Sequence, residues 1–150
     1  MTWLPETAPG GTDFERTLAL RPELRADLEA FERLLWESGS VDPALLELCR
    51  VRIAQLLGWE PEVRRCGPAE MAESKRAALE TWRRSGAFTP VERACLELAE
   101  GFVLDPHGVS EADVGAVAAH LEPAAVVLLV EALAFFDGFT RFRAILGVQD

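Results

Sequence analysis

Residues 47 to 66 read Glu-Leu-Cys-Arg-Val-Arg-Ile-Ala-Gln-Leu-Leu-Gly-Trp-Glu-Pro-Glu-Val-Arg-Arg-Cys. Asp42 and Pro43 stand just before this stretch, and aspartate followed by proline is typical of a helix N-cap and first helical position. Glycine commonly follows the last helical residue. The sequence therefore predicts a helix from Pro43 to Leu57 that stops at Gly58, with a new helix beginning near Pro61.

The remainder of the chain also carries helix signals. Thr89-Pro-Val-Glu92 is a capping box with proline at the first helical position, and a weaker version of the box begins at Ser110. No stretch alternates apolar and polar residues as a strand would, so we expect an all-α fold. Further helices are predicted over residues 22–37, 69–84, 90–103, 111–120 and 123–146. Residues 1–20, rich in proline and glycine, are predicted to form an extended N-terminal arm.

The stretch from Glu47 to Cys66 resembles the active-site region of the carboxymuconolactone decarboxylase and alkylhydroperoxidase D-like (AhpD-like) superfamily. In that superfamily a helix reading roughly E-L-V-R-L-R-V-A-Q-L-N-G precedes C-x-x-C-x-x-x-H. The residues in register here are Glu47, Arg50, Arg52, Ala54, Gln55 and Gly58. The segments 88–100 and 137–146 are similar to other helices of the superfamily, so the resemblance covers about residues 20 to 147. It implies an AhpD-like helical bundle of about six to seven helices, with residues 21–150 as a single domain.

The redox residues of the superfamily are replaced in this chain. Trp59 and Glu62 stand at the two cysteine positions, and Cys66 stands at the histidine position. In the peroxidase branch the two thiols attack and resolve, while the Glu and His pass protons. A second branch, which often reads G-x-E-Y-E-W-x-x-H, keeps its Gly and both Glu here at Gly58, Glu60 and Glu62. The resemblance makes Glu47, Glu62 and Cys66 the candidate catalytic residues.

Each candidate also has a structural interpretation. Glu47 is either an acid or base with a raised pKa or a buried partner of Arg50 or Arg143. Glu62 is either a second such acid or a solvated carboxylate at a helix start, where the helix dipole favours it. Cys66 is either a reactive thiol or a small core residue in the space of the absent imidazole.

Three functions from different classes follow. The first is acid/base chemistry on a small organic acid or lactone through Glu47. The second is a non-catalytic oligomer that binds a small molecule or a protein. The third is peroxidase-like antioxidant activity through Cys66.

Composition limits the possible partners. Twenty-five acidic and 15 basic residues give a net charge of −10, which opposes binding to the phosphates of nucleic acid. The most apolar run, residues 124–136, is shorter than the roughly 20 residues that span a bilayer. The N-terminus resembles no secretion signal. We therefore expect a cytoplasmic protein that binds neither nucleic acid nor membrane.

Two further expectations concern assembly and cofactors. The chain is 49% hydrophobic, and members of the superfamily form dimers, trimers or hexamers, so a homo-oligomer is expected. Its three cysteines, Cys49, Cys66 and Cys95, lack the spacing of a zinc site or a disulfide framework. No metal and no cofactor are expected.

Overall fold

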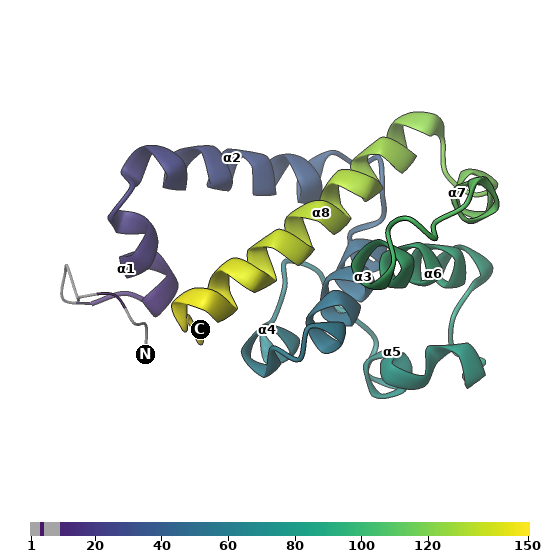
Figure 1. Ribbon diagram of the computed structural model, residues 1–150, viewed down its shortest axis with the longest axis horizontal. Helices are drawn as coiled ribbons and strands as arrows, with labels where there is room; N and C mark the ends of the chain where they lie inside the picture. Colours follow the sequence, from purple (N-terminus) through teal and green to yellow (C-terminus); the bar gives the residue numbers. More distant parts are fainter. Residues whose placement is uncertain (1–3, 5–9) are drawn as a thin grey trace.

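The structure, a computed structural model, describes residue 4 and residues 10–150. These residues form eight α-helices and one 3-10 helix and contain no β-strand (Figure 1), which confirms the predicted all-α fold. The elements are α1 Asp13–Ala19, α2 Pro22–Glu37, α3 Pro43–Leu56, α4 Glu60–Arg64, α5 Glu73–Ala78, η1 Leu79–Arg84, α6 Pro90–Leu104, α7 Glu111–Ala118 and α8 Pro123–Leu146.

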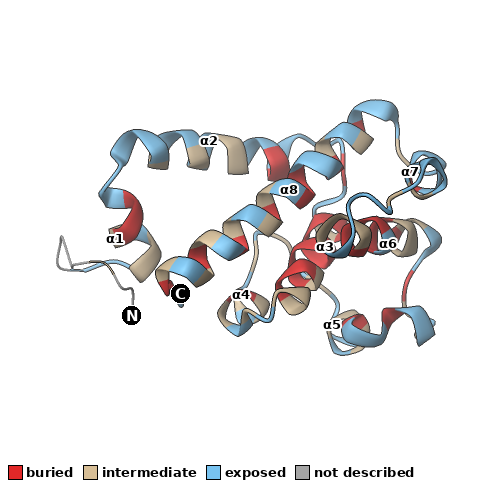
Figure 2. Cartoon of the chain, viewed as in Figure 1, coloured by how far each residue is buried: buried red, intermediate tan, exposed pale blue. Residues whose placement is uncertain are grey.

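Helix α3 forms the centre of the fold. The Asp42 side chain accepts a hydrogen bond from the Ala44 amide at its start, and Gly58, after its end, has a φ of +66° that favours glycine. Nine of the 14 residues of α3 are buried, and the helix packs against α6 and α8 (Figure 2). Because it lies between other helices, α3 buries charged residues as well as apolar ones.

Helix α8 packs along α3 and contributes to the main hydrophobic core through Leu129, Leu133 and Phe136. Its 24 residues make it long and apolar enough to cross a membrane, judged by length and composition alone. The sequence had suggested a segment of only about 13 apolar residues. The difference arises because the helix continues through Phe139 and Phe142, which stack on each other. The core helix of a soluble protein passes the same test.

The predicted extended arm is wrong for residues 13–19, which form α1. Thr12 accepts a hydrogen bond from the Glu15 amide while the Glu15 side chain accepts one from Thr12, which completes a capping box. Phe14 then packs edge-on against Phe139 of α8, with 5.3 Å between the ring centroids. Residues 1–3 and 5–9 of the predicted arm lie outside the described part of the chain.

The predicted helix over residues 69–84 is also shorter than expected. It begins only at Glu73 and continues as the 3-10 helix η1 from Leu79. The preceding segment instead covers buried parts of the fold: Gly67 lies against the carboxylate of Glu47, and Met71 packs on a second apolar cluster around Leu48 and Trp82. A straight helix over residues 69–84 would lack these contacts with Glu47 and Leu48 of α3.

Candidate functional site

The guanidinium of Arg50 on α3 is almost completely buried and donates five hydrogen bonds. Its Nε and Nη2 donate to the two carboxylate oxygens of Glu47, at 2.8 and 2.6 Å. Its Nη1 donates to the Glu62 carboxylate at 2.6 Å and to the Glu62 carbonyl at 2.9 Å, and Nη2 also reaches the Arg65 carbonyl at 2.8 Å. Since an arginine has five N–H donors, none of them is left unpaired.

These contacts decide the protonation state of Arg50. Burial alone would lower its pKa, but the hydrogen bonds and the negative charges of Glu47 and Glu62 raise it above the usual value. The side chain therefore remains a cation that ties α3 to α4 and to the loop after α4. Arg50 is one of the residues that the sequence shares with the superfamily.

Glu47 is completely buried in this network. Both of its oxygens are occupied by Arg50, Arg76 lies 4.0 Å away, and Gly67 covers the carboxylate. The pocket that adjoins the network is not lined by Glu47. Of its two interpretations, the geometry matches the buried ion pair with Arg50; the other predicted partner, Arg143, pairs with Glu62 instead.

Glu62 is buried as well, with 3% of its side chain exposed, so its interpretation as a solvated helix-start acid is wrong. Besides Arg50, its carboxylate pairs with Arg65 at 2.8 Å and Arg143 at 3.2 Å. Burial raises the pKa of Glu62, but Arg65, Arg50 and Arg143 together outweigh burial and lower it. A general acid at neutral pH needs a raised pKa, so Glu62 does not meet the requirement for that role.

Cys66 is exposed, and its interpretation as a small core residue is wrong. The other two cysteines are buried: burial raises the pKa of Cys49 well above its usual value and that of Cys95 to about 12. Cys66 is thus the accessible thiol of the chain. The adjacent Gly67 contacts Glu47, so the chain passes Glu47 at this point.

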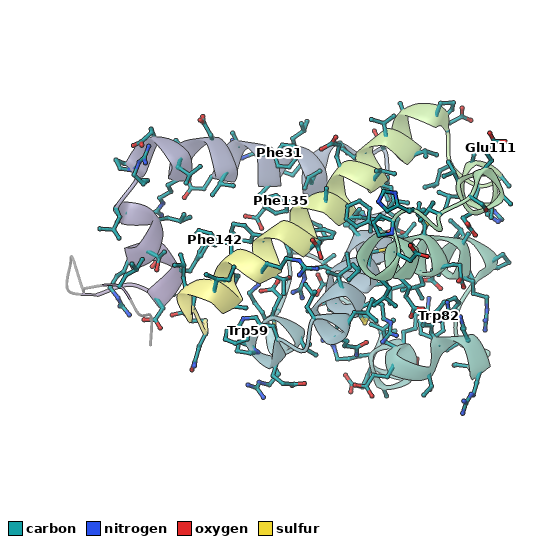
Figure 3. All side chains as sticks on the ribbon, in the orientation of Figure 1. Phe31, Trp59, Trp82, Glu111, Phe135 and Phe142 are labelled. Atoms are coloured by element: carbon teal, nitrogen blue, oxygen red, sulfur yellow. The ribbon has the colours of Figure 1, made fainter. Side chains whose placement is uncertain are left out.

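A pocket of about 330 Å³ opens beside the network, where residues from α1, α2, α8 and the segment after α4 meet. Figure 1 shows α1, α2 and α8 around this end of the molecule, and Figure 3 labels Phe31 of α2 and Phe135 and Phe142 of α8, which lie outside the pocket lining. The lining residues are Thr12, Phe14, Glu15, Glu32, Arg65, Cys66, Phe139, Arg143 and Asp150. Of the three predicted catalytic residues, only Cys66 lies in this pocket.

Arg143 is a further residue of this site, beyond the three candidates predicted from the sequence. Only 4% of its side chain is exposed. Its Nε lies 3.2 Å from the Glu62 carboxylate, but the geometry makes no hydrogen bond, and Nε is buried without a hydrogen-bond partner. The guanidinium carbon lies 4.7 Å from the ring centroid of Phe14. Burial lowers the pKa of Arg143, against the opposing charge of Glu62.

A buried arginine without hydrogen bonds is unusual, because buried polar groups are nearly always paired. Stacking on Phe14 occupies the face of the guanidinium and leaves its N–H groups free to donate in the plane. A signal in the sequence did exist: Arg143 stands where the superfamily has an asparagine. Its importance depends on its position against Phe14, which only the fold provides.

The charges around the pocket are unevenly balanced. Glu47 and Glu62 share the cations Arg50, Arg65 and Arg143, and Arg76 lies 4.0 Å from Glu47, so the arginines outnumber the carboxylates in this network. Among the residues that the structure describes, no group of three or more His, Cys, Asp or Glu side chains is placed to hold a metal ion. The lining of the pocket itself contains three carboxylates, those of Glu15, Glu32 and Asp150, and two guanidinium groups, those of Arg65 and Arg143, so an anion would be favoured only directly beside the two arginines.

Comparison with known proteins supports the fold. No protein-family model matches the sequence, and no curated protein sequence matches it. A crystal structure of a protein of unknown function from Agrobacterium tumefaciens, proposed to be the antioxidant defence protein AhpD, superimposes with a TM-score of 0.77 and 19% sequence identity. The match covers 89% of this chain and 94% of that one. The chain therefore has an AhpD-like fold, as predicted, and an identity this low establishes the fold alone.

Proposed function

We propose that this AhpD-like protein, which lacks the dithiol, binds a small organic acid in the pocket beside Arg143. The observation that carries the proposal is the buried guanidinium of Arg143, which lines the pocket and is held by an ion pair with Glu62, while its Nε makes no hydrogen bond to the described residues. A carboxylate would accept two parallel hydrogen bonds from such a group. The pocket volume is also within the range of small-molecule sites.

In this proposal Glu47 and Glu62 support the site and do not carry acid/base chemistry. Glu47 fixes Arg50, and Arg50 with Arg65 fixes Glu62. Glu62 in turn holds Arg143 at 3.2 Å. This chain of contacts keeps the Arg143 side chain in place before a ligand arrives, which reduces the entropy cost of binding.

The test is a thermal-shift screen with small aliphatic and aromatic carboxylates and with the matching neutral amides. We expect carboxylates to raise the melting temperature of the protein and the amides to leave it unchanged. The shift should disappear in Arg143→Gln and persist in Arg141→Gln, because Arg141 lies on the same helix but is half exposed and paired with Asp137. Arg143→Lys, which keeps the charge, serves if the glutamine variant fails to fold. Equal shifts with acids and amides would contradict the proposal.

A second candidate function rests on Cys66, which is exposed and lines the same pocket. As a thiolate, Cys66 would attack one oxygen of a hydroperoxide and become a sulfenic acid, while the O–O bond breaks and the other oxygen leaves as an alcohol after gaining a proton. The remaining two cysteines are buried, so a thiol from solution would have to reduce the sulfenic acid back to the thiol.

A peroxidase assay with a low-molecular-weight thiol as reductant tests this second function. Activity should be present in the wild type, absent in Cys66→Ser and retained in Cys95→Ala. Activity that survives in Cys66→Ser would exclude it.

We also propose that the chain forms a cytoplasmic homo-oligomer. Several large apolar side chains are exposed on the single chain, among them Leu34 on α2 and Val127 and Ile145 on α8. Burial of such side chains between subunits is favourable. Light scattering should give a mass that is a multiple of 16.5 kDa, and a dilute species of 16.5 kDa would count against this assembly.

A further inference from the structure

Three carboxylates line the pocket together with Arg143, and they differ in what they contact. The Glu15 side chain accepts a hydrogen bond from the Thr12 amide at 2.9 Å. Asp150 accepts one from the Phe14 amide at 3.0 Å. Glu32, on α2, makes no hydrogen bond and no ion pair within the part of the chain that the structure describes. Glu15 and Asp150 thus hold the start of α1, while the carboxylate of Glu32 has no such role.

Glu32 and Arg143 come from different helices and line the same pocket without touching. Glu32 is half-buried, and its negative charge acts on Arg143 by raising its pKa, although burial has the larger and opposite effect. Within the described residues, the Glu32 carboxylate and the Arg143 guanidinium form no ion pair with each other. Glu32 and Arg143 thus present opposite charges in one small pocket, whose lining also includes Arg65, Glu15, Asp150 and the rings of Phe14 and Phe139.

We infer that the acid bound in this pocket also carries an ammonium group, so that the ligand class is a small amino acid with an apolar side chain. Its carboxylate would bind the guanidinium of Arg143, its ammonium would bind the carboxylate of Glu32, and its apolar side chain would contact Phe14 and Phe139. This inference rests on the proposed binding of organic acids and adds the role of Glu32 to it.

The charges of the pocket disfavour simpler ligands. A simple acid would bring a negative charge near the half-buried Glu32, and a simple amine would bring a positive charge near Arg143; like charges at close range are repulsive. A neutral molecule would leave Arg143 with only its ion pair to Glu62 and would give Glu32 no partner, and half-buried polar groups without partners are costly. Only a molecule with both charges satisfies both residues.

Calorimetric titration with three probes of the same shape tests the inference: L-phenylalanine, 3-phenylpropanoate, which lacks the ammonium, and phenethylamine, which lacks the carboxylate. We expect L-phenylalanine to bind at least tenfold more tightly than 3-phenylpropanoate, and phenethylamine to show no binding. In Glu32→Gln the two acids should bind equally. Glu29→Gln is the matched control, because Glu29 lies on the same helix but pairs with Arg25, and it should retain the preference.

The outcomes of the titration distinguish amino-acid binding from the binding of organic acids in general. If neither acid binds the wild type, both are overturned. If 3-phenylpropanoate binds as tightly as L-phenylalanine, or if Glu32→Gln keeps the preference, organic-acid binding stands and the amino-acid inference is wrong.

Discussion

Gly67 lies so close to the buried carboxylate of Glu47 that a Cβ at residue 67 would overlap its oxygens. The Glu47 carboxylate cannot move aside cheaply, because Arg50 holds both of its oxygens. We therefore predict that Gly67→Ala lowers the free energy of unfolding by about 1–3 kcal/mol, the usual cost of overpacking.

Urea denaturation measures this effect. The matched control is Gly86→Ala, since a Cβ at residue 86 would meet no atom within 4 Å. The contact between Gly67 and Glu47 would be disproved if both variants had the same stability.

Arg50 should be among the least replaceable residues of the chain. Arg50→Met removes both hydrogen bonds of the buried Glu47 carboxylate and one of the three arginine partners of Glu62, and breaking a buried ion pair in this way costs about 3–5 kcal/mol. Arg64→Met, which removes an exposed pair with Glu60, should leave the unfolding midpoint nearly unchanged.

The double variant Glu47→Met with Arg50→Met separates charge from packing. Removing Glu47 together with Arg50 deletes the carboxylate whose two hydrogen bonds are lost in Arg50→Met, so the double variant should be more stable than Arg50→Met alone. A double variant less stable than Arg50→Met would show that packing dominates.

The stability of the protein should depend on pH through Glu62. Its pKa is lowered in the folded protein from a usual value of 4.5, so the unfolded state binds the proton more tightly. The stabilisation is therefore fully present above about pH 4.5 and is lost as the pH falls below that value toward the folded pKa.

Urea denaturation between pH 3 and pH 7 tests this dependence. In Glu62→Gln the free energy of unfolding should be lower at pH 7, and the difference from wild type should shrink as the pH falls below 4.5. A difference that stays constant over this range would mean that the Glu62 charge is not responsible.

The three cysteines should differ sharply in reactivity. Cys66 is exposed, whereas Cys49 and Cys95 are buried and burial raises the pKa of both thiols. A thiol-specific disulfide reagent at pH 8 should modify one thiol in the native wild type and none in native Cys66→Ser. In denaturant it should modify all three thiols of the wild type. A second reactive thiol in the native protein would contradict the described burial.

Local sequence signals predicted most of the fold. Asp42 with Pro43 placed the start of α3, and the Thr89 capping box placed the start of α6, because both signals satisfy amide groups within the first turn. The Thr12–Glu15 box is of the same kind, yet the prolines and glycines before it suggested an extended arm instead. The Thr12–Glu15 capping box was sufficient by itself to predict the start of α1.

The site was less predictable because burial arises from contacts distant in sequence. Glu62 resembles an exposed helix-start acid until Arg50, Arg65 and Arg143 are brought around it. Cys66 stands at the place of a superfamily histidine, and nothing in its immediate neighbours indicates that it opens to a pocket. Glu32 could not be predicted as a site residue, because only the packing of α2 and α8 places it in the same pocket lining as Arg143.

Arg143 is proposed to bind the carboxylate of a small-molecule ligand. A crystal structure determined with saturating L-phenylalanine tests this binding most directly. We predict that both carboxylate oxygens accept hydrogen bonds from the Arg143 guanidinium at about 2.7–2.9 Å, with the aromatic ring against Phe14 and Phe139. An empty pocket at saturation, or a ligand carboxylate bound away from Arg143, would contradict the claim.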